Sequence, residues 1–166
     1  MLVLGVDPGS VRTGWALIEG TASSPVMLRA DVIALPRSLG FSLRLAALKD
    51  QFDAVLDLQL PDVAVVESPF QGVNPRSALQ LAHARGVILA ALGERGIPVE
   101  EYAPATIKKT VTGSGRADKD QVRRMVQAVL AVTLEAGAHD LSDALAAAYC
   151  HLAHGNLKAA IERSRR

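Results

Sequence analysis

The chain has one cysteine, few aromatic residues, almost no net charge and no long hydrophobic run. The single cysteine, Cys150, excludes an intrachain disulfide, which fits a reducing compartment. No apolar run approaches the length of about 18 residues that a membrane span needs, so we expect no membrane association. The first residues also lack the basic start and apolar stretch of a signal peptide. We therefore expect a cytoplasmic protein.

The composition excludes a disordered chain, because 49% of the 166 residues are hydrophobic and 21% are charged. A chain of this length suits one domain, which buries enough surface to fold without a disulfide or a structural metal. We expect that domain over residues 1–155. Residues 156–166 end in a basic run and are expected to form a short basic C-terminal tail.

The net charge of +1 conceals a basic segment. Residues 105–124 hold two acidic residues and six basic ones, which are Lys108, Lys109, Arg116, Lys119, Arg123 and Arg124. This local excess of positive charge suits a nucleic-acid-binding patch, although a solvated helix face has the same composition. Gly113 and Gly115 lie inside the segment and allow the backbone to approach phosphates closely.

Short apolar runs predict five strands, at residues 2–6, 13–19, 26–35, 63–66 and 97–102. Short connections make the first three antiparallel, whereas the later strands alternate with helices, which implies parallel pairing. Helical spacing of apolar residues predicts helices at residues 43–56, 77–95, 104–111, 118–132 and 140–154. The predicted fold class is therefore α/β, with a five-stranded mixed sheet that helices cover on both faces.

Two acidic residues stand where apolar strands end. Asp7 follows the run at residues 2–6, and Glu67 follows the run at residues 63–66. Side chains at the carboxyl ends of central strands lie at the mouth of an open α/β sheet, where ligands bind. Many strands end in a polar residue, however, so either acid alone has an ordinary structural interpretation.

Asp140 and Asp143 form a second acidic pair at the start of the last predicted helix. Their spacing of three places both on one helix face, although helix capping and the helix dipole explain the same two acids. The alanine-rich helix behind them must pack on another element, which brings the pair near Asp7 and Glu67. Four clustered carboxylates repel one another unless a cation holds them. Oxygen ligands without a cysteine or a histidine cluster favour two Mg²⁺ or Mn²⁺ ions, which commonly serve phosphodiester hydrolysis.

Five short segments resemble, in order, those of the RuvC-type Holliday-junction resolvases, the bacterial crossover junction endodeoxyribonucleases. The segments are Gly5-Val6-Asp7-Pro8-Gly9-Ser10 with Thr13-Gly14, Ala64-Val65-Val66-Glu67 with Phe70, Ser77-Ala78-Leu79 with Ala84-Arg85-Gly86, the run from Lys108 to Lys119, and Asp140-x-x-Asp143-Ala144-Leu145-Ala146. Each segment is modestly specific. Together they match in register over residues 2–155, which makes the resemblance highly specific.

This resemblance implies a ribonuclease-H-like fold and a homodimer with two active sites. It implies a structure-selective endonuclease that uses two Mg²⁺ or Mn²⁺ ions per active site. Such an enzyme resolves four-way DNA junctions by paired symmetric nicks, in homologous recombination and DNA repair. The implied partner is a branch-migration motor complex of the RuvA and RuvB type. By position, the catalytic and metal-binding acids are Asp7, Glu67, Asp140 and Asp143.

The resemblance also assigns residues to DNA binding. Phe70 matches an aromatic residue that the family inserts at the junction centre, although pattern alone favours a loop phenylalanine packed onto the core. Lys108 and Lys119 match basic residues that contact the DNA backbone near the cut. We add three further basic residues as DNA-binding candidates, which are Arg76, Lys109 and Arg116.

Alternatives remain for the site and for the function. In some relatives the first member of the final acidic pair is a histidine, but a shift to His139 breaks the spacing to Asp143, so we favour Asp140. Residues 5–10 also resemble the first phosphate loop of sugar-kinase and actin-like ATPases, which need two such domains where this chain has room for one. A ribonuclease H acting on RNA–DNA hybrids and a catalytically silent DNA-binding module are the other candidates.

Overall fold

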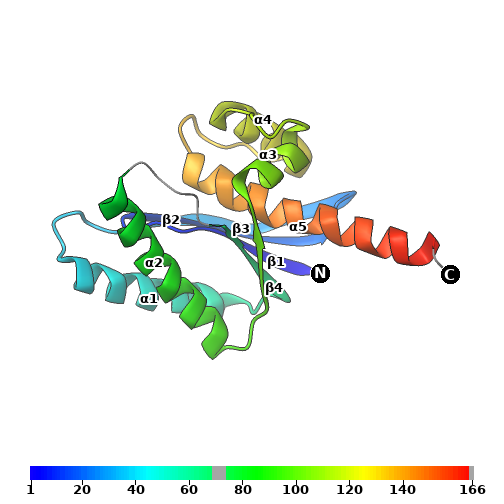
Figure 1. The fold of residues 1–166 in the computed structure, drawn as a ribbon. Coiled ribbons are helices and arrows are strands. Elements are labelled where there is room, and N and C mark those ends of the chain that lie inside the picture. The colour runs from blue at the N-terminus through cyan, green and yellow to red at the C-terminus, as the bar shows by residue number, and fades with distance from the viewer. Residues whose placement is uncertain (69–73, 165–166) are drawn as a thin grey trace.

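The chain folds around a five-stranded sheet with the strand order β3-β2-β1-β4-β5 (Figure 1). The computed structural model describes residues 1–68 and 74–164, with side chains described up to Gly155. The strands are β1 (Leu2–Asp7), β2 (Arg12–Thr21), β3 (Ser24–Ala34), β4 (Val63–Glu67) and β5 (Val99–Tyr102). The helices are α1 (Phe41–Leu58), α2 (Pro75–Glu94), α3 (Pro104–Thr112), α4 (Lys119–Leu130) and α5 (His139–Ser164).

The sheet is mixed, as the sequence predicts. β2 pairs antiparallel with β1 and with β3, as expected for strands joined by short connections. β4 pairs parallel with β1 and with β5. The chain reaches β4 from β3 through α1, and it reaches β5 from β4 through α2, which makes a right-handed crossover possible. β1 and β4 therefore point in the same direction at the centre of the sheet, and their carboxyl ends lie at the same edge.

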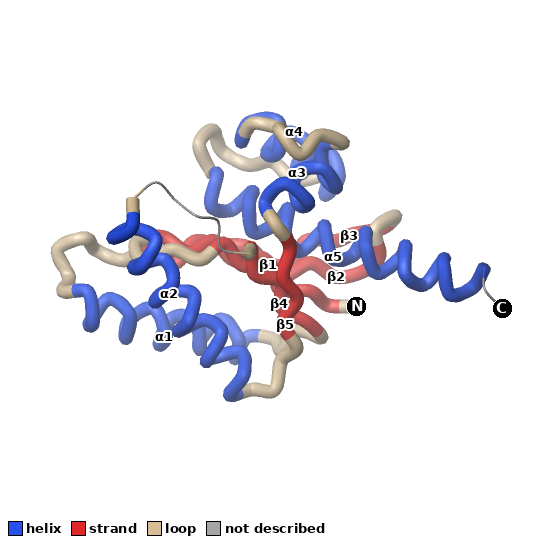
Figure 2. The backbone as a smooth tube through the Cα atoms, in the orientation of Figure 1, coloured by secondary structure: helices blue, strands red, loops and turns tan. Residues whose placement is uncertain are grey.

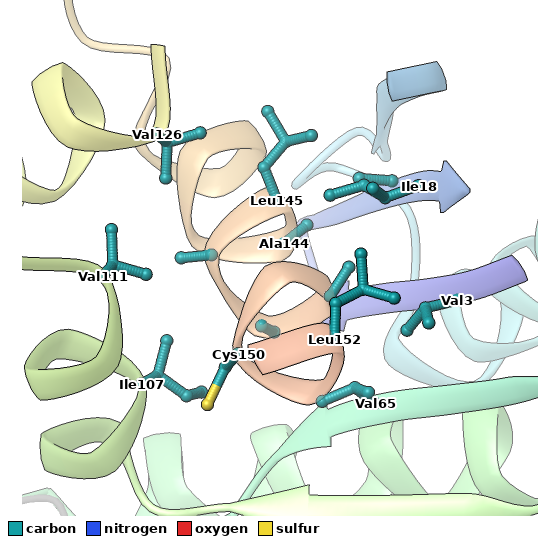
Figure 3. Packing of buried hydrophobic residues seen from close by; sticks show 14 of the residues in the cluster. Val3, Ile18, Val65, Ile107, Val111, Val126, Ala144, Leu145, Cys150 and Leu152 are labelled. Carbon is teal, nitrogen blue, oxygen red and sulfur yellow. The ribbon is translucent and has the colours of Figure 1, made fainter. Parts of the chain in front are cut away.

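Helices cover both faces of this sheet. Figure 2 shows α1 and α2 on one side of the strands and α3, α4 and α5 on the other. Side chains alternate along β1, so Leu4 and Val6 pack with Phe52 on the α1 side, whereas Val3 packs with Leu152 on the α5 side. Figure 3 shows this second core, in which residues of β1, β2 and β4 meet α5 while α3 and α4 close its far side. Because the side chains of β1 and β4 are buried on both faces of the sheet, the ends of these two strands are held in place.

Two glycines let α5 lie directly on the sheet. A Cβ atom on Gly5 would stand 2.0 Å from the backbone oxygen of Ala144, and one on Gly14 would stand 2.0 Å from that of Asp140. Neither distance is compatible with a side chain, so both positions require glycine for close backbone approach. The first turns of α5 are consequently held against β1 and β2, at the edge where Asp7 ends its strand.

The last helix is longer than the sequence predicts. We expected it to end at about residue 154, but α5 continues to Ser164, so the predicted end of the helix was wrong. The division into a domain over residues 1–155 and a basic tail over residues 156–166 stays a prediction. The segment after Gly155 and Asn156 is rich in good helix formers such as lysine, alanine and glutamate, and it contains no proline. One glycine costs a helix only about 1 kcal/mol and does not end it. No helix in the described residues is both long and apolar enough for a transmembrane span.

Candidate active site

A pocket of about 190 Å³ lies at the edge where β1 and β4 end. Asp7 is the last residue of β1 and Glu67 is the last residue of β4, and the parallel pairing of these strands places the two acids side by side. Asp143, near the start of α5, lines the same pocket. The structure therefore brings three of the four sequence-predicted acids together, from segments up to 136 residues apart in the chain.

Asp140, the fourth predicted acid, lies at the rim of this site. It is absent from the pocket lining, and its Oδ2 accepts a hydrogen bond from Nε of Arg12 at 2.5 Å. Its charge nevertheless reaches the pocket, because it contributes to raising the pKa of Asp7. The choice between Asp140 and His139 is not decided by the lining, since neither residue belongs to it.

The pocket holds more negative charge than its surroundings accommodate. Burial, together with repulsion from Asp143 and Glu67, raises the pKa of Asp7 from 3.8 to about 8. Burial, followed by repulsion from Asp143, also raises the pKa of Glu67. Such a site stabilises any cation that enters it, because a positive charge relieves the repulsion among the acids.

Lys119 supplies one positive charge to the pocket. The side chain of Asp118 caps α4 by accepting a hydrogen bond from the backbone N–H of Gln121, and the side-chain oxygen of Gln121 accepts one from the backbone N–H of Asp118. This capping box fixes Lys119 as the first residue of α4, with its Nζ donating to Oδ2 of Asp143 at 3.0 Å. Burial lowers the pKa of Lys119, but its hydrogen bond to Asp143 and its acidic neighbours outweigh that effect and raise the pKa.

The donor set suits a hard divalent cation. The acids offer only carboxylate oxygens, which are the ligands that Mg²⁺ and Mn²⁺ prefer. As they stand, no three His, Cys, Asp or Glu side chains within the described residues form a metal-holding group. Two of the acids instead direct an oxygen to a cationic side chain, Asp143 to Lys119 and Asp140 to Arg12. The Lys119 ammonium thus stands where the site needs a positive charge, so the residues fit a metal.

The sequence-predicted basic residues fall into two groups. Lys108 and Lys119 line the acidic pocket, as the DNA-binding prediction requires of residues near a cut. Lys109 lies on another side of α3 and lines a larger cavity of about 670 Å³, whose lining contains no carboxylate. Arg116, between α3 and α4, and Arg76, in the first turn of α2, are exposed to solvent. Phe70 lies outside the described residues, so its predicted role stays a prediction.

Sequence reasoning missed two residues that shape the site. Thr13 is fully buried, and its Oγ1 donates to the backbone oxygen of Gly9 at 2.8 Å and accepts from the Gly9 N–H at 3.1 Å. This pair of bonds closes the turn that follows Asp7, and the Gly9–Thr13 spacing in the sequence was the available signal. Arg12 was missed because its partner, Asp140, is 128 residues away and no local pattern reveals the pair.

Comparison with known proteins shows the family to which the chain belongs. The family model described as "Crossover junction endodeoxyribonuclease RuvC" matches residues 3–151. The chain belongs to the RuvC family. The RuvC protein of Anaeromyxobacter dehalogenans is 44% identical over 92% of this chain and 81% of its own length. The RuvC protein of Alkalilimnicola ehrlichii is 41% identical over 98% of this chain and 97% of its own length.

Solved structures agree with membership of the RuvC family. Thermus thermophilus RuvC in complex with a Holliday junction substrate has a TM-score of 0.87 and 28% identity, covering 95% of this chain and 96% of that one. A fowlpox virus resolvase bound to a Holliday junction is only 14% identical, with a TM-score of 0.56, and therefore shows a shared fold alone. The predicted ribonuclease-H-like architecture is confirmed by the Thermus structure.

Proposed function

We propose that this chain is a structure-selective endonuclease that resolves four-way (Holliday) DNA junctions by paired symmetric nicks. One observation carries the proposal. A chain of the RuvC family places Asp7, Glu67 and Asp143 around one pocket with Lys119 among them. Relatives that match nearly the whole chain are crossover junction endodeoxyribonucleases, and a solved relative holds a Holliday junction. The proposed work belongs to homologous recombination and DNA repair in the cytoplasm.

The acids of the pocket are proposed to hold two Mg²⁺ or Mn²⁺ ions per active site. Such ions, when bound, supply an activated water and stabilise the leaving oxygen of a phosphodiester. Asp7 and Glu67 offer their carboxylates from the ends of buried central strands, which fixes both in place. Asp143 offers its carboxylate from α5, and Asp140 completes the set from the rim.

The basic residues are proposed to hold the DNA backbone. Lys108 and Lys119 line the pocket and can contact the phosphate to be cut and its neighbours. Arg76, Lys109 and Arg116 lie outside the pocket lining and are exposed, and they are proposed to add further contacts to the DNA backbone. Contacts of this kind bind any phosphate backbone, so the selectivity for junctions requires a feature beyond them.

Phe70 is the proposed source of that feature, as a wedge that opens base stacking at the junction centre. Phe70→Ala is expected to slow junction cleavage at least tenfold while leaving the melting temperature nearly unchanged. An exposed ring contributes little to stability, whereas truncation of a core phenylalanine costs about 3–5 kcal/mol. A large fall in melting temperature, as for the buried Phe52→Ala, or full cleavage activity contradicts the wedge.

Two partners follow from the proposal. Paired nicks need two active sites, and the described residues of one chain form an acidic pocket at the ends of β1 and β4, so the working unit is proposed to be a homodimer. Junctions must also be brought to cleavable positions, which suits a branch-migration motor complex of the RuvA and RuvB type as the second partner.

The decisive experiment compares three substrates in Mg²⁺ or Mn²⁺: a synthetic four-way junction, a linear duplex of the same sequence and an RNA–DNA hybrid. The proposal predicts symmetric nicks in the junction and no cutting of the other two. Asp143→Asn is the matched control, expected to bind the junction in a gel-shift assay without cutting it. Equal cutting of the hybrid would instead assign a ribonuclease H activity, and cutting by Asp143→Asn would remove Asp143 from the site.

A further inference from the structure

Arg12 and Asp140 form an ion pair across the rim of the acidic pocket. Arg12 is the first residue of β2, and Asp140 is in the first turn of α5. Nε of Arg12 lies 2.5 Å from Oδ2 of Asp140, and the two side chains are 55% and 31% exposed. The pair thus joins an otherwise unassigned arginine to an acid of the proposed metal site.

Backbone packing holds Arg12 and Asp140 near each other, but it does not fix the conformations of their side chains. Gly14, two residues after Arg12, lies against the backbone oxygen of Asp140, so β2 and the start of α5 cannot separate without disrupting the fold. Both side chains, however, stand in partly exposed positions where they can rotate. The Asp140 carboxylate therefore lies between the Arg12 guanidinium at the rim and the acidic pocket, where a bound cation would attract it.

We propose that Arg12 is a positioning residue, whose guanidinium holds Asp140 at the rim until a divalent cation in the pocket competes for that carboxylate. The proposal rests on the proposed function, because it takes the pocket as a metal site. An exposed ion pair is weak enough to be exchanged, since such pairs contribute little in water. Lys119 differs from Arg12, because it lines the pocket itself and pairs with the more buried Asp143.

The test is metal affinity without DNA, which does not depend on catalysis. Mn²⁺ is titrated into wild type and Arg12→Gln, and free Mn²⁺ is read from its electron paramagnetic resonance signal. Release of Asp140 is expected to strengthen Mn²⁺ binding by about twofold to fivefold, the range that a pair of this exposure contributes. Arg29→Gln, which removes an exposed arginine from the middle of β3, is the matched control and should leave the affinity unchanged.

A double-mutant cycle separates the ion pair from a general charge effect. If Arg12 acts through Asp140, Arg12→Gln should gain nothing in an Asp140→Asn background. A gain that persists there reflects repulsion between Arg12 and the metal, and it overturns the proposal. Unchanged melting temperatures of the metal-free variants would exclude misfolding. Misfolding would in any case weaken Mn²⁺ binding, not strengthen it.

The outcomes also distinguish this proposal from the proposed function. Unchanged or weaker Mn²⁺ binding by Arg12→Gln overturns the role of Arg12 but leaves the metal site standing. Wild-type binding that is lost in Asp143→Asn supports the metal site independently of Arg12. Absence of Mn²⁺ binding by the wild type overturns both the metal site and the role of Arg12.

Discussion

At the scale of single residues, Asp7 connects the chemistry of the site to the stability of the fold. Burial and three acidic neighbours, Asp143, Glu67 and Asp140, raise its pKa from 3.8 to about 8. An acid with a higher pKa in the folded state binds more protons when folded, so the free energy of unfolding falls as pH rises through that window. The metal-free protein should therefore lose stability between about pH 4 and pH 8.

The Asp7→Asn substitution tests whether ionisation of Asp7 lowers the stability of the metal-free protein. The amide carries no charge, so in EDTA the variant should melt above wild type at pH 8 and show a flatter decline between pH 5 and 8. Each unit of pKa is worth about 1.4 kcal/mol, so the gain can reach several kcal/mol. Asp50→Asn, at an exposed position on α1, is the control and should keep the wild-type profile. An Asp7→Asn profile parallel to that of wild type would show that Asp7 is charged without penalty.

At the scale of elements, the position of α5 on the sheet decides whether the acids meet. Gly14→Ala places a methyl group 2.0 Å from the Asp140 backbone oxygen, which no side-chain rotation relieves. We expect a loss of about 1–3 kcal/mol in stability and a severe loss of cleavage, because the start of α5 must move. Gly93→Ala on α2 has open space around the new Cβ and should be neutral or slightly stabilising. Denaturant unfolding and junction-cleavage assays of both variants check this prediction. Equal stability and equal cleavage rates in Gly14→Ala and Gly93→Ala would contradict it.

Elements and strand-end acids were readable from the sequence because each depends on a local pattern. An apolar run of four or five residues is enough to predict β4 or β1, and parallel pairing then brings Asp7 and Glu67 to one edge. Contacts between distant segments leave no such pattern, which is why the Arg12–Asp140 pair appears only in the structure. The end of α5 was mispredicted for a related reason. A glycine such as Gly155 can end a helix, but whether it does depends on the residues that follow it.

At the scale of the whole molecule, positive charge is concentrated although the net charge is +1. The segment 105–124 contributes Lys108, from α3, and Lys119, the first residue of α4, to the lining of the pocket. Junction affinity should therefore fall steeply with salt, because each phosphate neutralised adds about −0.9 to the slope of log K against log salt.

Lys119→Ala should flatten that slope by about one unit, measured without divalent metal so that no DNA is cut. Arg29→Ala, which removes the same charge from β3, should leave the slope unchanged. If both substitutions alter the slope equally, binding follows net charge rather than the charge placed at the pocket.

The proposed homodimer predicts that each chain makes one of the two cuts, through the acidic pocket at the ends of its β1 and β4 strands. Refolding wild type together with Asp143→Asn in equal amounts should give half of the dimers one active and one inactive site. On a plasmid that extrudes a four-way junction, those mixed dimers should cut one strand, so nicked circles accumulate where wild type gives linear DNA. Gel electrophoresis separates the two products, and sedimentation reports the dimer. If linear DNA merely halves without any nicked circle, the two cuts do not come from two chains.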